Sequence, residues 1–317
     1  VPEVVLVTSP RPDGTVAPGI LAAAALAGVD EVYRVGGPGV IAALAYGTET
    51  IRPVDVIVGP GSTRVAQAKR EVASAGLVGV PSAFAGPSEV VVIADASTPV
   101  EFAAIDVVLQ AEHGPDGLAW LVTWDETVAD AVAAAVAEIV PRSPRRAHLE
   151  ATLAEGGYVV LCDGPAQAMD VANAIAPEHL ELLVDDHEAL LPLVRHAGAV
   201  FCGPFAPASV GDYLAGPNHV LPTFGSARFS GALRVDDFLK HVHVVSMDQP
   251  ALDDVAGHVE VLATYEGLAA HADSVSSEGI VPISPGHHHP PFRRLRPGPI
   301  GLVTRAGGQE PVHVGGA

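Results

Sequence analysis

The sequence predicts an α/β protein made of two wound parallel sheets. Short runs rich in β-branched residues alternate with alanine-rich segments of helical length along most of the chain. An order of strand, helix and strand is typical of parallel sheets, because a helix carries the chain back to the starting edge. Glycines directly after several runs would place helix N-termini where nucleotide phosphates commonly sit. None of these turns reads G-x-G-x-x-G, so ordinary connections explain them equally well.

Residues 1–84 are predicted to form a first Rossmann-like domain that is incomplete at its start. The chain begins with Val1, already inside a strand-like run, which indicates that upstream sequence is missing. The expected strands are Val4–Thr8, Glu31–Val35 and Val54–Val58, and the expected helices are Pro18–Val29, Val40–Ala45 and Ser62–Ala75.

Residues 85–230 are predicted to form a second Rossmann-like domain that carries most of the active site. The expected strands are Ser88–Asp95, Trp120–Thr123, Tyr158–Cys162, Leu180–Val184 and Ala199–Cys202. The expected helices are Val100–Glu112, Val128–Val140, Arg146–Ala154, Ala166–Ile175 and Glu188–His196. Residues 203–225 are rich in Gly, Pro and Asn, show little periodicity and are expected to be a long loop, a feature that is often functional.

The end of the chain divides into two parts. Residues 231–278 are predicted to be mainly helical, with a short helix, a strand at His243–Ser246 and a helical pattern from Pro250 to Val275. Residues 279–317 are basic and proline-rich, include a run of three histidines and are expected to be a disordered tail.

Composition excludes several classes of protein. A net charge of −20 argues against nucleic acid or anionic lipid as a partner, because both need a positive surface. The apolar run from Gly19 to Val29 is too short to span a membrane. Cys162 and Cys202 are the two cysteines, too few for a disulfide framework, so a reducing, cytoplasmic location is expected.

The chain is organised around the octet Leu109–Asp116, where an alanine-rich segment runs into glycine and proline. A helix ending here would present Gln110 and His113 on one face, since they are three residues apart. Imidazole commonly binds zinc, but an amide oxygen is an unusual second ligand. On this octet alone, a histidine that interacts with the end of the helix dipole beside a solvated glutamine is the better explanation.

Four groups together make a metal-assisted acid/base enzyme the better interpretation. Each group alone has a structural explanation, such as a helix cap or a turn. The groups are Gln110 with Glu112-His113, Pro177–Leu180, Gly211–Tyr213 with Asn218-His219, and Glu266 with Ala270-His271. They supply a carboxylate, an amide and two imidazoles for a divalent cation, and a Glu-His pair for proton transfer.

The chain resembles the histidinol dehydrogenase family in motifs that run in order from its first residues to about Val275. The motifs are Val35–Gly37 with Ile41–Ala45, Val58–Gly61, Ala68–Arg70, Ala85–Val90, Gln110–Asp116, Pro177–Leu180, Gly211–Tyr213 and Asn218–Thr223. The resemblance implies NAD-dependent oxidation of L-histidinol to L-histidine through a bound aldehyde, the last step of histidine biosynthesis. It also implies one zinc ion per subunit.

The resemblance assigns roles to individual residues. Gln110, His113, Asp212 and His271 would bind zinc, with His271 coming from the other subunit of a homodimer held together by residues 231–278. Glu178 would activate the water that attacks the aldehyde, and His179 would be the general base. Ser88, His219 and Glu266 match positions that contact the amino-alcohol substrate.

The positions that contact NAD in the family are changed here. Gly39 stands where members usually have Gln, and Ser62 where they have Asn. A third contact, a tyrosine, would lie in an N-terminal segment of on the order of a hundred residues that the printed sequence lacks. Two alternatives therefore stay open. One is a relative that oxidises another polar alcohol, such as a sulfonated diol; the other is a degenerate homologue that binds zinc or a ligand without transferring hydride.

Overall fold

The computed structural model of the chain describes residues 1–82, 88–114 and 116–276. It divides into two compact units, Val1–Leu239 and Lys240–Ala317, and each is described here by itself. The predicted tail at 279–317 lies outside the described residues. The finer division at residues 84 and 230 stays a prediction.

The first part of the Val1–Leu239 unit contains a small parallel sheet. Strands β1 (Val5–Val7) and β2 (Glu31–Tyr33) pair in parallel, and helix α1 (Pro18–Leu26) connects them. Helices α2 (Pro38–Tyr46) and α3 (Thr63–Ser74) follow and pack on one another. The predicted order of strand, helix and strand is confirmed here.

The strand predicted at Val54–Val58 is wrong. This segment makes a single bridge, Val56 to Gly79, and Ile57 N–H donates to the Gly79 carbonyl at 2.9 Å. Pro53 before the segment and Pro60 after it have no N–H to donate, so the ladder cannot extend.

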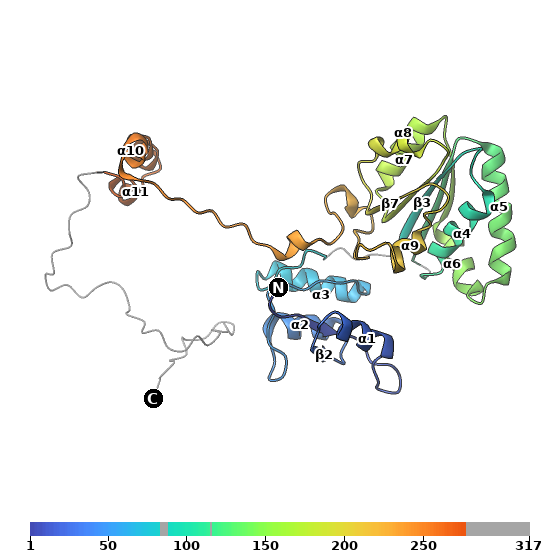
Figure 1. The fold of residues 1–317 in the computed structure, drawn as a ribbon, viewed down its shortest axis with the longest axis horizontal. Coiled ribbons are helices and arrows are strands. Elements are labelled where there is room, and N and C mark those ends of the chain that lie inside the picture. The colour runs from blue at the N-terminus through green and yellow to red at the C-terminus, as the bar shows by residue number, and fades with distance from the viewer. Residues whose placement is uncertain (83–87, 115, 277–317) are drawn as a thin grey trace. The chain divides into compact units, whose positions relative to one another are not determined.

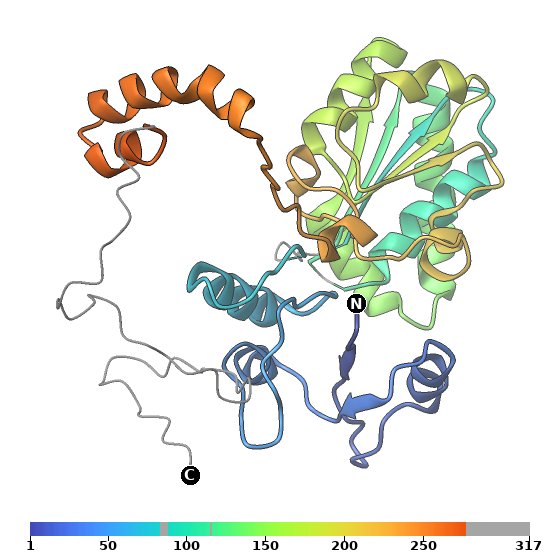
Figure 2. The ribbon, with the colours of Figure 1, turned by 60° about the vertical axis from the view of Figure 1, so that its left-hand side comes forward.

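The second part of this unit is a five-stranded parallel sheet with the order β5-β4-β3-β6-β7 (Figures 1 and 2). Its strands are β3 (Glu89–Ala94), β4 (Leu118–Thr123), β5 (Gly157–Leu161), β6 (His179–Leu183) and β7 (Ala199–Cys202). Its helices are α4 (Val100–Ala111), α5 (Glu126–Ile139), α6 (Arg146–Gly156), α7 (Pro165–Ile175) and α8 (His187–Leu190). The α/β class predicted from the alternation is therefore confirmed.

Helices cover both faces of this sheet, which explains why the central strand is apolar after its first residue, Glu89. All six residues of β3 are buried. On one face Val90 and Val92 pack against α4 and α5; on the other Val91 and Ile93 pack against Met169 of α7. The centre of the sheet is thus a rigid support for whatever lies at its edges.

Two segments in the second part of the sheet unit differ from the prediction. The helix expected at Glu188–His196 ends at Leu190 and continues as the 3₁₀ turn η2 (Leu191–Leu193), because Pro192 lacks an N–H. The loop expected at 203–225 contains a short helix, α9 (Ala208–Tyr213). A six-residue helix leaves too short a periodic pattern to be read from sequence.

The remaining segments include two further differences. The 3₁₀ turns η1 (Val140–Arg142), η3 (Ser226–Arg228) and η4 (Val235–Phe238) complete the elements of the first unit. No strand forms at His243–Ser246, whose residues are exposed, because a strand needs a paired neighbour. The helical pattern after Pro250 is divided at Gly267, which has a φ of 75° and separates α10 (Gln249–Tyr265) from α11 (Ala269–Asp273).

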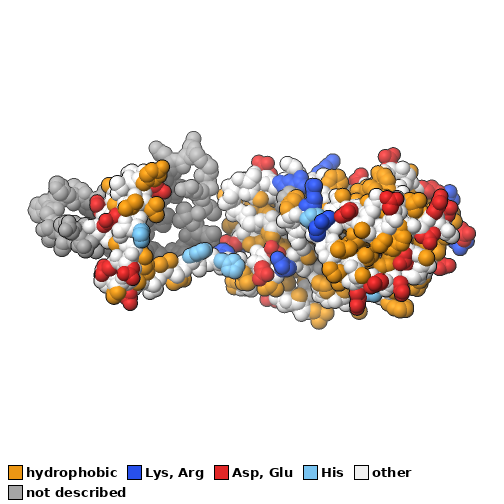
Figure 3. Space-filling model, turned by 90° about the horizontal axis from the view of Figure 1, so that it is seen from above, with side chains coloured by type: hydrophobic (Ala, Val, Ile, Leu, Met, Phe, Trp, Pro, Cys, Tyr) orange, Lys and Arg blue, Asp and Glu red, His pale blue; other side chains and the backbone are white. Residues whose placement is uncertain are grey.

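Surface and sulfur features agree with the composition. On the face drawn in Figure 3, acidic side chains are scattered over the surface while basic ones gather in a smaller area.

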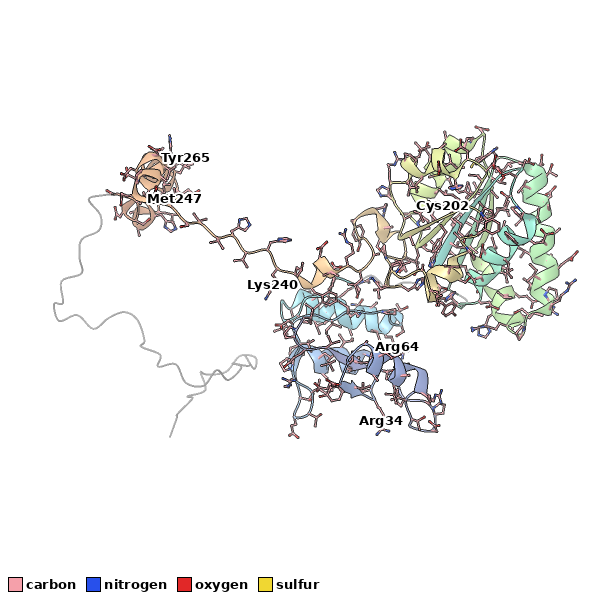
Figure 4. All side chains as sticks on the ribbon, viewed as in Figure 1. Arg34, Arg64, Cys202, Lys240, Met247 and Tyr265 are labelled. Carbon is pink, nitrogen blue, oxygen red and sulfur yellow. The ribbon has the colours of Figure 1, made fainter. Side chains whose placement is uncertain are left out.

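Cys162 and Cys202 are both free, and Figure 4 places Cys202 at the end of β7. Among the described residues, no helix has both the length and the apolar character that crossing a bilayer requires.

Candidate active site

The predicted site residues of the sheet unit gather at the amino edge of the five-stranded sheet. Glu178 directly precedes β6 and His179 begins it, beside Val90 of the parallel strand β3. Helix α4 runs back against the sheet and brings Gln110, in its last turn, to the same edge. Nucleotide sites in wound sheets usually lie at the carboxyl edge of the sheet, so this cluster lies at the opposite edge of the five-stranded sheet.

Glu178 and His179 are both buried and are held by the backbone of Glu89. The His179 Nδ1 atom lies 3.2 Å from the Glu89 carbonyl oxygen, and Glu89 N–H donates to Glu178 Oε2 at 3.3 Å. A carbonyl only accepts, so Nδ1 carries the ring proton and Nε2 keeps a free lone pair. Burial lowers the pKa of His179 to about 4, which keeps the ring neutral.

The Glu178 carboxyl group has a pKa raised to about 7, chiefly by burial. Hydrogen bonds from Glu89 N–H and the Ser88 side chain lower its pKa in part. The result is a carboxyl group that can exchange a proton near neutral pH. Ser88, a predicted substrate contact, therefore touches the acid/base pair directly.

Asp212 and His219 complete the cluster from the segment after β7. Asp212 lies in α9, and its Oδ1 is 2.9 Å from His219 Nε2 and 3.9 Å from His179 Nε2. The rings of His179 and His219 stack with their centroids 5.1 Å apart, and the centroid of the Phe201 ring lies 5.9 Å from that of His179. His179 Nε2, buried and without a hydrogen-bond partner among the described residues, faces this carboxylate.

Gln110 and His113 have different surroundings from each other. Gln110 is completely buried, and neither atom of its amide group has a hydrogen-bond partner within the described parts of the chain. His113 lies beyond the end of α4, is exposed, and has Nδ1 3.3 Å from the Gln110 carbonyl oxygen. It is near enough for its charge to lower the pKa of His179. Buried amides are normally hydrogen-bonded, so Gln110 lacks a partner that a ligand would supply.

The geometry of this cluster suits a metal ion. Ligand atoms of Glu178, His179 and His219 lie within 4.8 Å of one another. This trio contains none of the ligands that the resemblance implies, but Asp212 adjoins it through His219. Carboxylate, imidazole and amide oxygen together suit zinc and several neighbouring divalent metals.

A pocket opens from the Glu178 and His219 side chains toward the first part of the unit. Its lining comes from the turn after Val58, from Pro81, Ser82 and Ser88, from Glu178 of the acid/base pair, and from the chain from His219 onward. The lining residues are Gly59–Gly61, Pro81, Ser82, Ser88, Glu178, His219–Thr223, Ser230–Arg234 and Asp237. The pocket therefore joins the acid/base cluster to the first glycine-rich region.

The other predicted residues lie apart from this cluster in the sequence. Glu266 follows α10 and His271 lies in α11, both in the Lys240–Ala317 unit. Gly39 is the second residue of α2, and Ser62 directly precedes α3. The roles of these four residues stay predictions.

Comparison with known proteins identifies the family. The family model for histidinol dehydrogenase matches residues 1–278. The chain belongs to the histidinol dehydrogenase family. It is 50% identical over 275 residues to histidinol dehydrogenase 2 of Trichormus variabilis, covering 87% of this chain and 63% of that protein. It is 46% identical over 278 residues to histidinol dehydrogenase of Bacillus subtilis, covering 87% and 64%.

A solved structure agrees with this assignment. The crystal structure of histidinol dehydrogenase from Elizabethkingia anophelis matches with a TM-score of 0.80 and 35% identity, covering 86% of this chain and 62% of that one. The chain thus spans less than two thirds of the length of these histidinol dehydrogenases.

Two buried charged residues of this family member were missed as site residues from sequence. Glu89 Oε1 accepts from Gly225 N–H at 3.2 Å, and its backbone holds the acid/base pair. Lys69 Nζ donates to the Gly59 carbonyl and lies 3.4 Å from the Ser82 carbonyl oxygen, which fixes two walls of the pocket. A lone acid opening an otherwise apolar strand was the available signal for Glu89.

We expect Glu89→Leu to destabilise the chain by about 1–3 kcal/mol, because the partly buried N–H of Gly225 loses its acceptor. Glu89→Gln should cost clearly less, since its amide oxygen can still accept. Urea unfolding followed by circular dichroism measures both. Equal losses for the two variants would show that the hydrogen bond is not what Glu89 contributes.

Proposed function

We propose that the protein oxidises L-histidinol to L-histidine in two NAD-linked steps through a bound aldehyde, with zinc as a resident metal. The observation that carries this proposal is the buried Glu178-His179 pair with the His179 lone pair beside Asp212. Family membership adds the reaction and the substrate class. The chain's own residues supply the proton transfers, as follows.

His179 is the proposed general base. An alcohol must lose its proton as hydride leaves, and Nε2 is the buried, available lone pair at the site. The Glu89 carbonyl holds the ring in the tautomer that leaves Nε2 free. Stacking against His219 and contact with Phe201 restrain the ring plane. The imidazole is therefore oriented before the substrate arrives, which lowers the cost of reaching the reactive geometry.

Glu178 is the proposed base for the second step, in which water adds to the aldehyde. Its pKa of about 7 suits proton removal from water near neutral pH. Ser88 and the Glu89 N–H hold the carboxyl group in place. The hydrated aldehyde then needs a base once more, and His179 is adjacent.

Gln110, His113 and Asp212, with the partner subunit's His271, would hold the zinc ion. The side-chain amide of Gln110 supports this ligand set, because its buried oxygen accepts no hydrogen bond from any described residue and is therefore available to a metal ion. When bound, zinc would orient the substrate through nitrogen atoms and polarise its hydroxyl group. Asp212 and His219 would then fix the substrate beside His179.

The second unit supports a homodimer in which each site takes residues from both subunits. On α10, Val261, Leu262 and Tyr265 are 68%, 65% and 89% exposed. Figure 4 labels Tyr265 on this helix. Large apolar side chains exposed together are typical of a surface that packs against another chain. Glu266 and His271 directly follow this surface, so dimerisation would carry them to a partner's site.

NAD is the proposed hydride acceptor, bound near Gly39 and Ser62. Both lie at helix N-termini, which favour phosphate groups. A side chain added at Gly39 would meet no atom within 4 Å, and Ser62 makes no capping hydrogen bond. The glycine can offer no side-chain contact and the serine only a short one, so we expect weak NAD binding.

The double variant Gly39→Gln with Ser62→Asn is expected to tighten NAD binding by about 1–3 kcal/mol, roughly 5- to 150-fold in Kd. Titration of NAD by calorimetry measures this. Gly19→Gln is the matched control, because Gly19 is also the second residue of a helix that begins with proline and also has open space around it. Equal affinities in the double variant and the unaltered chain would remove these positions from the cofactor site.

The test of the function is NADH formation from L-histidinol, followed by absorbance, with a zinc assay on the same sample. Zinc-dependent NADH formation supports the proposal. Bound zinc without NADH, over a wide range of NAD, favours one of two alternatives. Turnover of a different polar alcohol, such as a sulfonated diol, would identify a relative with another substrate; no turnover of either would favour a homologue that only binds.

A further inference from the structure

A pair of buried carboxyl groups lies on the side of the sheet that α4 covers. Asp106 of α4 is 3% exposed and Glu181 of β6 is fully buried, and the two carboxyl groups are near enough to change each other's pKa. Glu181 Oε2 has no hydrogen-bond donor among the described residues, so only a proton between the two carboxyl groups can pair this buried oxygen with Asp106. Neither forms an ion pair with lysine or arginine within the described residues. Burying two acids without a cation is costly, so a fold that keeps them needs a reason.

The surroundings of the two carboxyl groups raise the pKa of both. Burial, the charge of Asp106 and the hydrogen bond between them raise the pKa of Glu181 well above its ordinary range. Burial also raises the pKa of Asp106, and the hydrogen bond with Glu181 offsets part of that rise. One proton shared by the two carboxyl groups joins them by an O–H···O hydrogen bond, which gives the buried Glu181 Oε2 its partner. An uncharged side chain at position 181 that can both donate and accept a hydrogen bond would make the same two contacts.

Glu181 also reaches a third element. Its Oε1 accepts from Ala208 N–H at 3.2 Å, and Ala208 is the first residue of α9. The first N–H groups of a helix have no acceptor within the helix. Pro207, which precedes α9, makes no side-chain capping hydrogen bond. Glu181 accepts the hydrogen bond from Ala208 N–H in its place.

In each of the three joined elements, a residue of the proposed site lies close in sequence to the residue that makes the connection. The spacing is four residues from Asp106 to Gln110 on α4, two from Glu181 to His179 on β6, and four from Ala208 to Asp212 on α9. Residues four apart on a helix, or two apart on a strand, lie on the same face. The same connection therefore sets the relative positions of the amide, the imidazole and the carboxylate.

We propose that Asp106 and Glu181 are positioning residues, a polar clip that holds the metal-binding face of α4, β6 and α9 in register. The inference rests on the proposed function for its consequence on zinc, but the clip itself is a statement about α9. A six-residue helix preceded by proline has little stability of its own. Without the clip, Asp212 loses its fixed distance from the other ligands.

The first test uses the unaltered full chain, so its result does not depend on whether a variant folds. Hydrogen exchange followed by NMR should show the Ala208 amide protected at least as well as the later amides of α9. An Ala208 amide that exchanges as fast as those of exposed loops would overturn the clip, because the hydrogen bond to Glu181 should protect it.

Three variants give the second test. Glu181→Leu removes both hydrogen bonds at similar volume, and should raise exchange throughout α9 and weaken binding of Zn²⁺ by about 10- to 100-fold. Glu181→Gln should restore both properties, because its oxygen can accept from Ala208 and its NH₂ can donate to Asp106. Leu182→Ala, buried on the opposite face, is the control for general destabilisation and should lower Tm without loosening α9 specifically.

The outcomes separate this inference from the proposed function. If the unaltered chain binds no Zn²⁺, the metal proposal fails, while exchange in α9 still decides the clip. If Glu181→Gln is as defective as Glu181→Leu, or if Leu182→Ala loosens α9 equally, the positioning role is refuted.

Discussion

Replacing His179 by alanine is expected to lower kcat for L-histidinol oxidation by about 100- to 10,000-fold while zinc stays bound. The reason is that Nε2 of this residue is the buried lone pair beside Asp212. Removing the ring leaves no equivalent base at that point, since Glu178 is held on the other side by Glu89 and Ser88. Steady-state NADH formation and metal content on the same sample measure the two effects.

The matched control is His148→Ala, which removes an exposed imidazole on α6. It should change neither rate nor zinc. Two results would contradict the assignment of His179. Unchanged turnover would remove it from the mechanism, and loss of zinc together with turnover would place it among the ligands, as its closeness to Glu178 and His219 allows.

Replacing His271 by alanine is expected to lower zinc affinity and activity together, by at least about 100-fold, since even residues that only support a ligand cost roughly 10- to 100-fold. The prediction comes from the family and from the place of His271 after an exposed apolar helix. Zinc content after dialysis and the rate of NADH formation should fall in parallel. His258→Ala, an exposed histidine on α10, is the control.

Mixing the His179→Ala and His271→Ala proteins tests whether His271 acts across a dimer. In a mixed dimer, one site would carry both substitutions and the other neither. Random exchange of subunits should therefore restore about a quarter of the unaltered activity in a two-fold symmetric dimer. If His271 completed the site of its own chain, both sites of every mixed dimer would be defective, and no activity would return.

The α/β class and most element positions follow from the sequence because they depend on local pattern. The run from Val90 to Ala94 is apolar throughout, as expected for a strand covered on both faces, and the helices on either side have the expected length. The prediction failed where structure depends on a partner. Val54–Val58 and His243–Ser246 have strand-like residues but no ladder, since β pairing needs a second strand.

For the site, the sequence alone predicts the candidate reactive residues, and the tertiary structure decides how they are arranged. Residue type and motif pointed to Glu178, His179 and Asp212. Only the fold decided that Asp212 comes within 3.9 Å of His179, and that the site lies at the amino edge of the sheet. It also decided that Glu89 and Glu181 are buried. These properties depend on contacts between residues far apart in the chain, which local patterns do not encode.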